Sequence, residues 1–558
     1  MSGVLGWAAR IGCLLSRVRL DVAALLLSVA AHGGAQTQDG PAPLPSFAEL
    51  EASGAVIGEI RVVTANVFDT NDPQENNSFF RLANALHIQT RESVIRRALL
   101  FKPGDTVSVR VIEETERLLR GYDYLYDVKF RPIAYHDGVV DIEVMTRDTW
   151  SIDFGLRASR SGGSNSSGFN FTDRNLLGTG TTLGFGHSSN VDRSSDEFQF
   201  SNDRVFGTWT SVLYSHAVNS DGYSNAAAVV RPFYALDSRW TAGVTASQFD
   251  RIDPIYNSGN VVSQYRHRQD TGEVFGGWSH GLIDGWVQRY SLGVSSSDDA
   301  YATEPDLVAP DQLPTNQKLV GPFVRFELVE DRFDKQLNRN LIGRPEFFAL
   351  GLASTVQLGW ASIGWGSSQD ALLYKASISR GFEPGPEQTL MAQANIQGQF
   401  TDGQVYRQQV GAASQYYLPQ GKRWLFYAAA SADALSHPDV NDTLYLGGDN
   451  GLRGYPLRYQ SGTRRALFTT EERFFTDLYV WRLFRIGGAA FFDVGRAWGG
   501  NNVNTSNPGW LSDAGFGLRI AAARAASGSI LHVDIAFPIN TTPDIAKVQL
   551  LVKTKTSF

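Results

Sequence analysis

The chain has 558 residues, of which 19% are charged and 12% aromatic, and its formal net charge is −7. This balance argues against a nucleic-acid partner. The chain has one cysteine, Cys13, which excludes a disulfide framework and a site built from several thiolates.

The first 35 residues have the layout of a secretory signal. Basic residues precede an apolar run over 22–31, and small residues follow at Gly33 and Ala35. We expect cleavage near Ala35, which would also remove Cys13. Residues 36–54 contain Pro41, Pro43 and Pro45 and are predicted to form a flexible linker.

Residues 55–148 carry a mixed α and β pattern. We expect a strand over 57–68, a helix with Thr90 as its N-cap, a helix over 109–119, and strands over 128–133 and 139–146. The predicted order is β-α-α-β-β, with a polar insertion over 69–77 after the first strand. A generic α+β module is the alternative interpretation.

From residue 149 to 558 the hydrophobic period is two. In the segment 390–400, apolar residues alternate with Gln and Asn, and the preceding segment 372–379 does the same. After residue 35 no run reaches the roughly 20 apolar residues that a membrane helix needs, and only a closed barrel can otherwise satisfy backbone polar groups in lipid. A soluble β-sandwich also alternates, but its polar face usually carries more charge.

The strand number follows from chain length. With strands of about 10 residues, short turns on one side and long loops on the other, residues 149–558 predict an all-β transmembrane barrel of 16 antiparallel strands. Fourteen or eighteen strands are alternatives. We expect the first strand at 149–159 and the last at 548–558, where the chain ends on Phe558.

Several short motifs resemble the Omp85 superfamily of outer-membrane proteins, in particular its BamA- and TamA-like members. Residues 101–105, 118–122 and 126–128, with the order of elements, resemble its periplasmic POTRA domain. The segment 168–180 resembles the barrel signature of the family through Asp173, Asn175, Leu176, Leu177, Gly178 and Gly180. Phe558 resembles the C-terminal aromatic of the insertion signal of outer-membrane proteins.

A glycine-rich segment holding one arginine resembles the loop that folds back into the barrel lumen in this family. It contains Gly451, Leu452, Arg453, Gly454 and Tyr455. The segments 471–475 and 491–495, which contain Glu471, Arg473, Asp493 and Gly495, resemble the two strands that follow, and 533–538 resembles the penultimate strand.

Strand parity gives Arg453 acidic partners. If Phe492 and Phe474 face lipid, then Asp493, Glu471 and Arg473 face the lumen. A guanidinium pairs bidentately with carboxylates, so we hypothesise that Arg453, Asp493 and Glu471 lock the loop inside the barrel. The alternative is an ordinary porin lumen, which also holds paired charges.

The resemblance implies a factor that inserts or translocates polypeptides at the bacterial outer membrane, with the POTRA domain in the periplasm. Its partners would be the lipid bilayer, unfolded or secreted client polypeptides, and periplasmic chaperones or accessory proteins. A two-partner-type secretion pore and a passive channel or structural barrel are the alternatives, and the chain has length for one POTRA domain.

No enzyme, cofactor or metal site is predicted. The segment 277–281 matches the Gly-x-Ser-x-Gly nucleophile elbow, but no helix pattern follows to present the serine. The nine histidines lack paired metal-ligand spacing, and no phosphate-binding loop is present.

Overall fold

A computed structural model describes residues 44–500, 509–526, 528–540, 543, 545–555 and 557–558. The predicted signal and most of the predicted linker lie outside the described residues. The chain divides into two units, Met1–Leu44 and Pro45–Phe558, and all elements below belong to the second. No helix among the described residues is both long and apolar enough to cross a bilayer.

The N-terminal region is a small three-stranded sheet with helices. Its elements are α1 (Phe47–Ala52), β1 (Val56–Ala65), α2 (Ser78–Leu86), α3 (Glu92–Arg96), α4 (Val109–Arg120), β2 (Leu125–His136) and β3 (Val139–Asp148). The central strand β3 runs parallel to β1 and antiparallel to β2. Its core contains apolar side chains from the sheet and from α3 and α4.

The predicted β-α-α-β-β order is wrong in two places. A capping box between Ser46 and Glu49 makes α1 inside the predicted linker. The segment treated as a polar insertion continues into α2, which Asn77 caps through its side chain. Thr90 does not cap a helix, because its amide and hydroxyl donate to the carboxylate of Asp148 instead.

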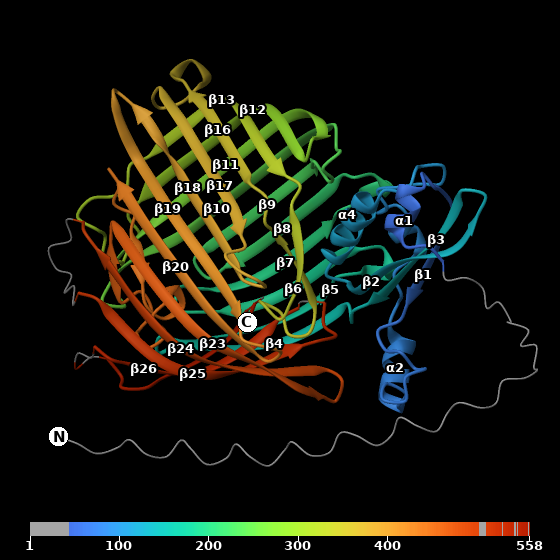
Figure 1. Ribbon diagram of the computed structural model, residues 1–558. Helices are drawn as coiled ribbons and strands as arrows, with labels where there is room; N and C mark the ends of the chain where they lie inside the picture. Colours follow the sequence, from blue (N-terminus) through green and yellow to red (C-terminus); the bar gives the residue numbers. More distant parts are fainter. Residues whose placement is uncertain (1–43, 501–508, 527, 541–542, 544, 556) are drawn as a thin grey trace, which may run out of the picture. The chain divides into compact units, whose positions relative to one another are not determined.

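The described residues from 152 onward form a closed antiparallel barrel of 20 strands (Figure 1). The strands are β4 (Ile152–Ser161), β5 (Ser164–Asp173), β6 (Thr181–Ser189), β7 (Ser194–Asn202), β8 (Ser211–Asn219), β9 (Gly222–Arg231), β10 (Trp240–Asn257), β11 (Asn260–Ile283), β12 (Trp286–Ala302), β13 (Gln317–Glu330), β16 (Ala353–Ala361), β17 (Ala371–Phe382), β18 (Thr389–Thr401), β19 (Gln404–Pro419), β20 (Trp424–Ser436), β23 (Arg464–Val480), β24 (Phe484–Trp498), β25 (Leu511–Ala522), β26 (Ile530–Pro538) and β27 (Gln549–Lys555).

The predicted number of 16 strands is therefore wrong. The prediction assumed long loops at one end of the barrel, whereas many connections at both ends are tight. Residues 162–163, 258–259 and 402–403 close hairpins at one end, and 284–285 close one at the other. Glycines with positive φ at 163, 259, 285 and 403 permit these turns, so the same length of chain holds more strands.

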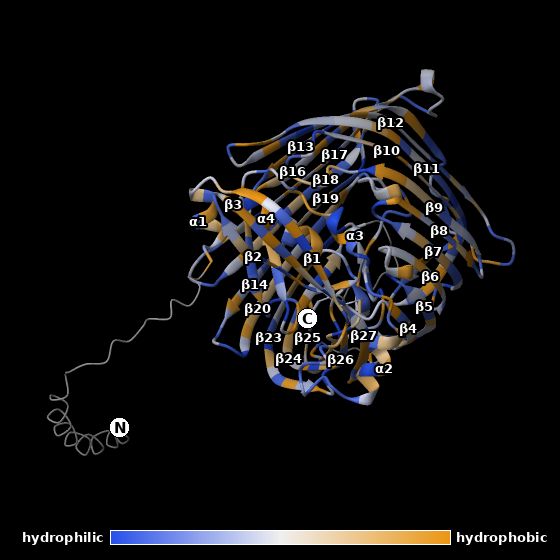
Figure 2. Cartoon of the chain, turned by 90° about the vertical axis from the view of Figure 1, so that its right-hand side faces the viewer, coloured by the Kyte–Doolittle hydropathy of each residue, from blue (hydrophilic) through white to orange (hydrophobic). Residues whose placement is uncertain are grey.

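The outer face of the barrel is apolar. Large hydrophobic side chains at alternate positions are exposed, as Val244 on β10, Leu292 on β12 and Ile378 on β17 illustrate. Figure 2 shows hydrophobic segments around the barrel wall. An exposed apolar band of this extent is expected where lipid, not water, surrounds the strands.

Two short hairpins lie outside the barrel sheet. The strands β14 (Phe333–Leu337) and β15 (Pro345–Ala349) lie in the connection between β13 and β16. The strands β21 (Leu444–Leu446) and β22 (Gln460–Gly462) lie in the connection between β20 and β23. In both connections the chain lies on the lumen side of the barrel wall.

The barrel closes between its last and first strands. In the described part of the chain, the register between β27 and β4 contains one pair of residues, Val552 with Arg160. Other neighbouring barrel strands pair over at least seven residues. We call this junction the seam.

Candidate functional site: a loop held inside the barrel

The connection between β20 and β23 carries the glycine-rich segment into the barrel. The pair β21–β22 and the 3-10 turn η4 (Gly448–Asn450) shape it. Arg453 lies between them and is 8% exposed. A charged group buried to this degree needs paired charges and hydrogen bonds.

The structure brings Arg453 together with both predicted acidic residues. Its Nε donates to Asp493 Oδ2 at 2.7 Å and its Nη2 to Asp493 Oδ1 at 2.9 Å, which is a bidentate pair. Its Nη1 donates to Glu471 Oε1 at 2.8 Å. The guanidinium also lies 3.5 Å from the centroid of the Phe491 ring.

The backbone of the loop requires its glycines and one strained residue. Leu452 has a φ of 57° and is fully buried. A Cβ on Gly454 would lie 2.7 Å from the Cβ of Asp513, so only glycine allows this approach. Tyr455 is also fully buried, and its hydroxyl donates to the carbonyls of Ser512 and Asn540.

Arg473 extends the ion pairs along β23. Its Nε donates to Glu471 Oε2 at 2.8 Å, so Glu471 accepts from two arginines. The Arg473 guanidinium stacks on the Tyr427 ring at 3.7 Å. Gly495, the last predicted site residue of this group, lies on β24, where a Cβ would come within 2.9 Å of the Ala466 carbonyl oxygen.

Three further charged residues belong to this cluster and were not predicted. Asp534 on β26 pairs with Arg519 on β25, and one of its oxygens lies 3.9 Å from Arg453 Nη1. Asp513 is fully buried opposite Asp493 in the register of β24 and β25. The parity argument applied to 533–538 would have placed Asp534 in the lumen.

A cavity of about 220 Å³ borders this cluster. Arg453, Glu471 and Asp493 line it together with residues from both sides of the seam. Ser161 comes from the end of β4, and Lys553 and Lys555 come from β27. The ion-paired loop and the seam therefore share one polar space.

The other side of the loop is tied to the opposite part of the barrel. Arg458 donates bidentately to Asp192, in the turn between β6 and β7, at 2.8 and 2.7 Å. Tyr256, at the end of β10, donates its hydroxyl to the same carboxylate. The loop thus spans the lumen between two buried or half-buried ion pairs.

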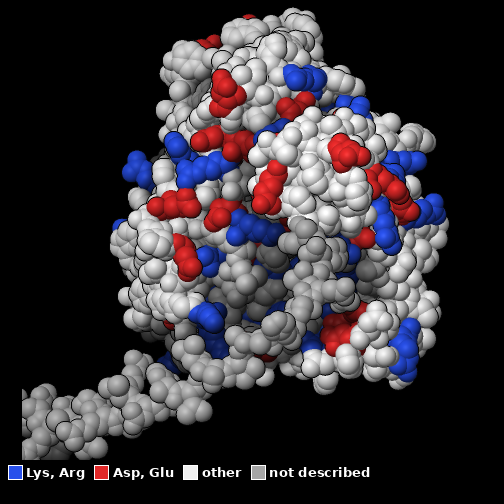
Figure 3. All heavy atoms as spheres, turned by 45° about the vertical axis from the view of Figure 1, so that its right-hand side comes forward, with Lys and Arg blue, Asp and Glu red and all other residues white. Residues whose placement is uncertain are grey.

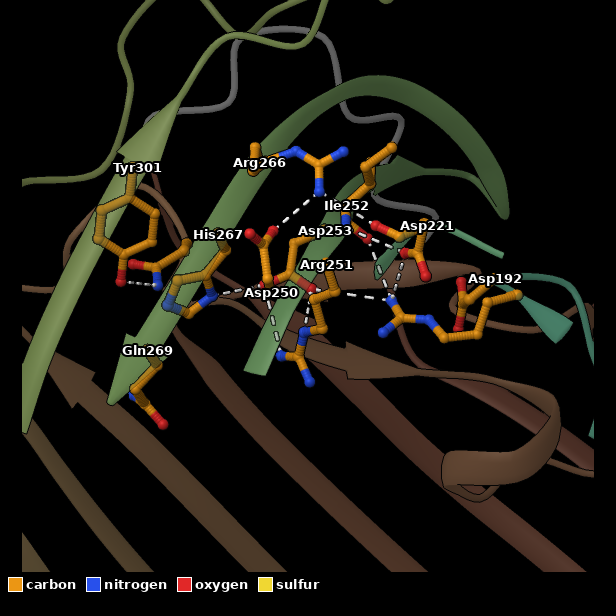
Figure 4. Close-up of polar contacts among 12 residues, drawn as sticks. Asp192, Asp221, Asp250, Arg251, Ile252, Asp253, Arg266, His267, Gln269 and Tyr301 are labelled. Atoms are coloured by element: carbon orange, nitrogen blue, oxygen red, sulfur yellow. Dashed lines mark hydrogen bonds and ion pairs between the residues drawn. The ribbon is translucent and has the colours of Figure 1, made fainter. Parts of the chain in front are cut away.

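A network of charged residues supports this second attachment (Figure 4). Arg266 on β11 pairs with Asp250 on β10 at 2.8 Å. His267 contacts Asp253 on β10 at 2.7 Å and Asp299 on β12 at 3.2 Å. These contacts cross-link three neighbouring strands beside the turn that holds Arg458.

The predicted barrel signature lies at the end of β5 and in the turn between β5 and β6, the second and third barrel strands. The side-chain oxygen of Asn175 accepts a hydrogen bond from the Gly180 amide at 2.7 Å, and the backbone amide of Asn175 donates to Asp173 Oδ1 at 3.0 Å. Leu176 begins the 3-10 turn η1 (Leu176–Gly178). Leu177 has a φ of 55° and exposes its side chain.

This turn docks on the N-terminal region. A Cβ on Gly178 would lie 2.2 Å from the Gln89 carbonyl oxygen, and the Gly178 oxygen accepts from the Arg91 amide. Asn175 Nδ2 donates to Thr90 Oγ1, which in turn donates to Asp148. His87 completes this buried network at 3.0 Å from Asp148.

A second turn repeats this geometry and was not predicted. The 3-10 turn η2 (Val205–Gly207) joins β7 to β8, and Phe206 has a φ of 55° like Leu177. Arg204 donates to the Arg97 carbonyl and to the Tyr122 hydroxyl of the N-terminal region. Both turns have two apolar residues followed by Gly-Thr, at 176–179 and at 205–208. This repeated pattern could have predicted the second turn from the sequence.

The hairpin β14–β15 packs into the lumen near the C-terminus. Phe348 and Ile342 belong to a buried cluster with Tyr417, Phe475 and Phe558. Asn340 accepts a hydrogen bond from the Phe558 amide at 2.7 Å and one from the Tyr417 hydroxyl at 3.0 Å. This position of the hairpin was not predicted.

Phe558 does not lie on the apolar outer face with Leu550. The last strand ends at Lys555, and Phe558 is 4% exposed, beside Phe475 at a centroid distance of 4.8 Å. The C-terminal residue therefore turns inward, where the aromatic ring also faces the Arg473 guanidinium.

Among the described residues, no group of three or more His, Cys, Asp or Glu side chains could hold a metal ion. The sequence between Gly277 and Gly281 runs within β11 and enters no helix. Ser279 is buried there and donates to the Gln288 carbonyl.

No protein-family model and no curated protein matches the chain. Solved structures of other proteins do match it. CdiB from Escherichia coli is 13% identical over 91% of this chain and 77% of that chain, with a TM-score of 0.48. CdiB from Acinetobacter baumannii is 12% identical over 90% and 73%, with a TM-score of 0.42.

BamA from Haemophilus ducreyi lacking POTRA domains 1–3 is 13% identical over 89% of this chain and 85% of that chain, with a TM-score of 0.39. At these identities and TM-scores the likeness concerns fold and carries no function to this chain.

Proposed function

We propose that this chain is an outer-membrane protein of the Omp85 type that inserts polypeptides into the membrane or translocates them across it. The observation that carries the proposal is the cavity shared by the Arg453 cluster and both seam strands. A client strand that pairs with β4 or β27 would alter the lining of the space in which the loop is held.

The short register of the seam supports this function. A strand pair held by few backbone hydrogen bonds separates more easily than its neighbours, and its exposed edges can template an incoming strand. Among the described residues, β27 pairs with β26 over all of its seven residues but with β4 at one, so the weakness belongs to the junction and not to the length of the strand.

The N-terminal region would lie in the periplasm as a POTRA-type domain. In the described part of the chain, β2 pairs with β3 and has no neighbour on its other side. Arg120 and Arg344 donate to backbone carbonyls at the start of β2, and the edge beyond Val128 can bind an extended client segment by strand addition. Figure 3 shows Lys and Arg interspersed with Asp and Glu on the face turned toward the viewer.

A reconstitution experiment tests the proposal. The purified full chain is placed in lipid vesicles and presented with an unfolded outer-membrane barrel polypeptide, and insertion is followed by protease protection of the client. We expect faster insertion than in empty vesicles. Single-channel conductance is recorded on the same preparation.

Other outcomes would assign other functions. Conductance without insertion would overturn the proposal in favour of a passive channel. Transfer of a secreted polypeptide into the vesicle lumen, without insertion of the barrel client, would favour a two-partner-type secretion pore. The lumen contents weigh against an open channel, since the Arg453 loop and the β14–β15 hairpin both occupy it.

A further inference from the structure

The helix α2 has one bare apolar side. Phe79, Leu82 and Leu86 recur at the spacing of one helix face and are 63%, 58% and 64% exposed. Phe80, on another side of the same helix, is 3% exposed. The helix therefore packs on the protein through one side and leaves a second hydrophobic side uncovered.

The packed side fastens α2 to the barrel. Phe80 stacks on Phe68 at a centroid distance of 4.0 Å, and both belong to a buried cluster with Trp150 and Leu483. Leu483 lies in the turn between β23 and β24. Glu75, in the turn before the helix, pairs with Arg524 in the turn between β25 and β26.

The helix consequently lies at the rim of the barrel. Figures 1 and 2 both show α2 at the end of the barrel that carries the N-terminal region. The Trp150 amide donates to the Arg524 carbonyl at 2.7 Å, and Trp150 lies two residues before β4, the first seam strand. The base of the seam and α2 share this support.

The exposed apolar side of α2 belongs with other exposed apolar residues at this end of the barrel. Leu478, near the end of β23, is 59% exposed, and Trp481 in the turn that holds Leu483 is 76% exposed. Exposed tryptophan at the end of a membrane strand marks the level of the lipid headgroups. The helix is attached to the same turn.

We propose that Phe79, Leu82 and Leu86 insert into the periplasmic leaflet of the outer membrane and that α2 is an interfacial helix beside the seam. The partner is lipid, since the face offers only side chains and no backbone edge to which a client strand could add. This inference rests on the proposed function only in taking the barrel to span the outer membrane.

Site-specific fluorescence in vesicles tests the inference. In a Cys13→Ser background, single variants Leu82→Cys and Leu86→Cys carry an environment-sensitive fluorophore, and the full chain is reconstituted in phosphatidylethanolamine and phosphatidylglycerol. We expect a blue-shifted emission and quenching by lipids that carry a doxyl group near the headgroup. Heat-modifiable migration in gels checks that each variant is folded.

Two controls separate the possible results. Arg81→Cys lies on α2 but away from the apolar side and is expected to remain unquenched. Val244→Cys lies on the outer face of β10 and is expected to be quenched by lipids labelled deeper in the acyl chain.

Quenching at Val244 but at neither α2 position would overturn the inference while leaving the membrane barrel intact. Absence of quenching at Val244 would overturn the barrel interpretation itself. A response of the α2 labels only when unfolded client polypeptide is added would mean that this face binds protein, and the lipid proposal would be wrong.

Discussion

Arg453 is the residue whose contacts define the loop position. Its guanidinium is bonded to Asp493 and Glu471 and stacked on Phe491, while its burial prevents water from replacing these partners. Breaking such a pair leaves uncompensated buried charges, which costs far more than the loss of a surface ion pair.

We predict that Arg453→Ala lowers the free energy of unfolding by roughly 3–5 kcal/mol. Arg453→Lys should cost less but still weaken the site, because an ammonium cannot make the bidentate pair. Urea titration in detergent, followed by tryptophan fluorescence, measures both. The exchange Arg453→Asp with Asp493→Arg should restore part of the loss, and a double variant no better than either single one would contradict the lock.

Asp192 makes the second attachment sensitive to pH. Burial would raise the pKa of Asp192, but the hydrogen bonds from Arg458 and Tyr256 outweigh it and hold that pKa below its ordinary value. A lowered pKa in the folded state stabilises the attachment above the unfolded pKa, which is about 4 for Asp. The stabilisation is lost as the pH falls through the folded pKa.

We therefore predict that the loop loosens as the pH falls below the ordinary Asp pKa of about 4 and through the lower pKa of folded Asp192. Proteolysis of the loop by pepsin, compared at pH 3 and at pH 5 and normalised at each pH to the cleavage of an unfolded substrate, measures the effect. Asp192→Asn should make the loop accessible at both values, whereas Asp402→Asn, in an outer turn between β18 and β19, should behave like the unmodified chain. Equal accessibility of the unmodified chain at both pH values would contradict the prediction.

At the scale of elements, the β14–β15 hairpin links three parts of the molecule. It holds the C-terminal residue through Asn340 and contacts the barrel through Phe348 and Tyr417. Lys335 pairs with Glu116 of the N-terminal region, and Arg117 stacks on the Phe333 ring. A displacement of the N-terminal region would therefore act on the hairpin.

We predict that Ile342→Asp increases single-channel conductance, because a carboxylate in the buried cluster expels the hairpin from the lumen. Ile363→Asp makes the same chemical change in an exposed turn and should leave conductance unchanged. Planar bilayer recording compares the two, and equal traces would show that the hairpin does not obstruct the lumen.

At the scale of the whole molecule, the seam is the place where the barrel can open. Arg160 and Val552 face each other across it. We predict that Arg160→Cys with Val552→Cys, oxidised to a disulfide in a Cys13→Ser background, abolishes client insertion and that reduction restores it.

A matched pair on a long hairpin provides the control. Ser247 and Thr271 face each other on β10 and β11, and their hydroxyl oxygens are 2.7 Å apart. Their cysteine variants should form a disulfide without affecting insertion. If both disulfides inhibit insertion equally, general rigidity of the barrel, and not the seam, would account for the effect.

Strand period and motif chemistry could be read from the chain directly. The alternation along β17 and β18, and the parity that turns Glu471, Arg473 and Asp493 to one side, are properties of each strand alone. The helix over 109–119 was predicted for the same reason and is α4. Such patterns survive in any arrangement of the strands.

The number of strands, the hairpin inside the lumen and the inward turn of Phe558 required the tertiary structure. The number of strands that a given length of chain can form depends on the summed lengths of all turns. The prediction overestimated the loop lengths and therefore gave 16 strands where the barrel has 20. The contacts of Asn340 with Phe558, and of Thr90 with Asp148 and Asn175, join residues far apart in sequence. Local period cannot encode them, because each depends on which surfaces closure brings together.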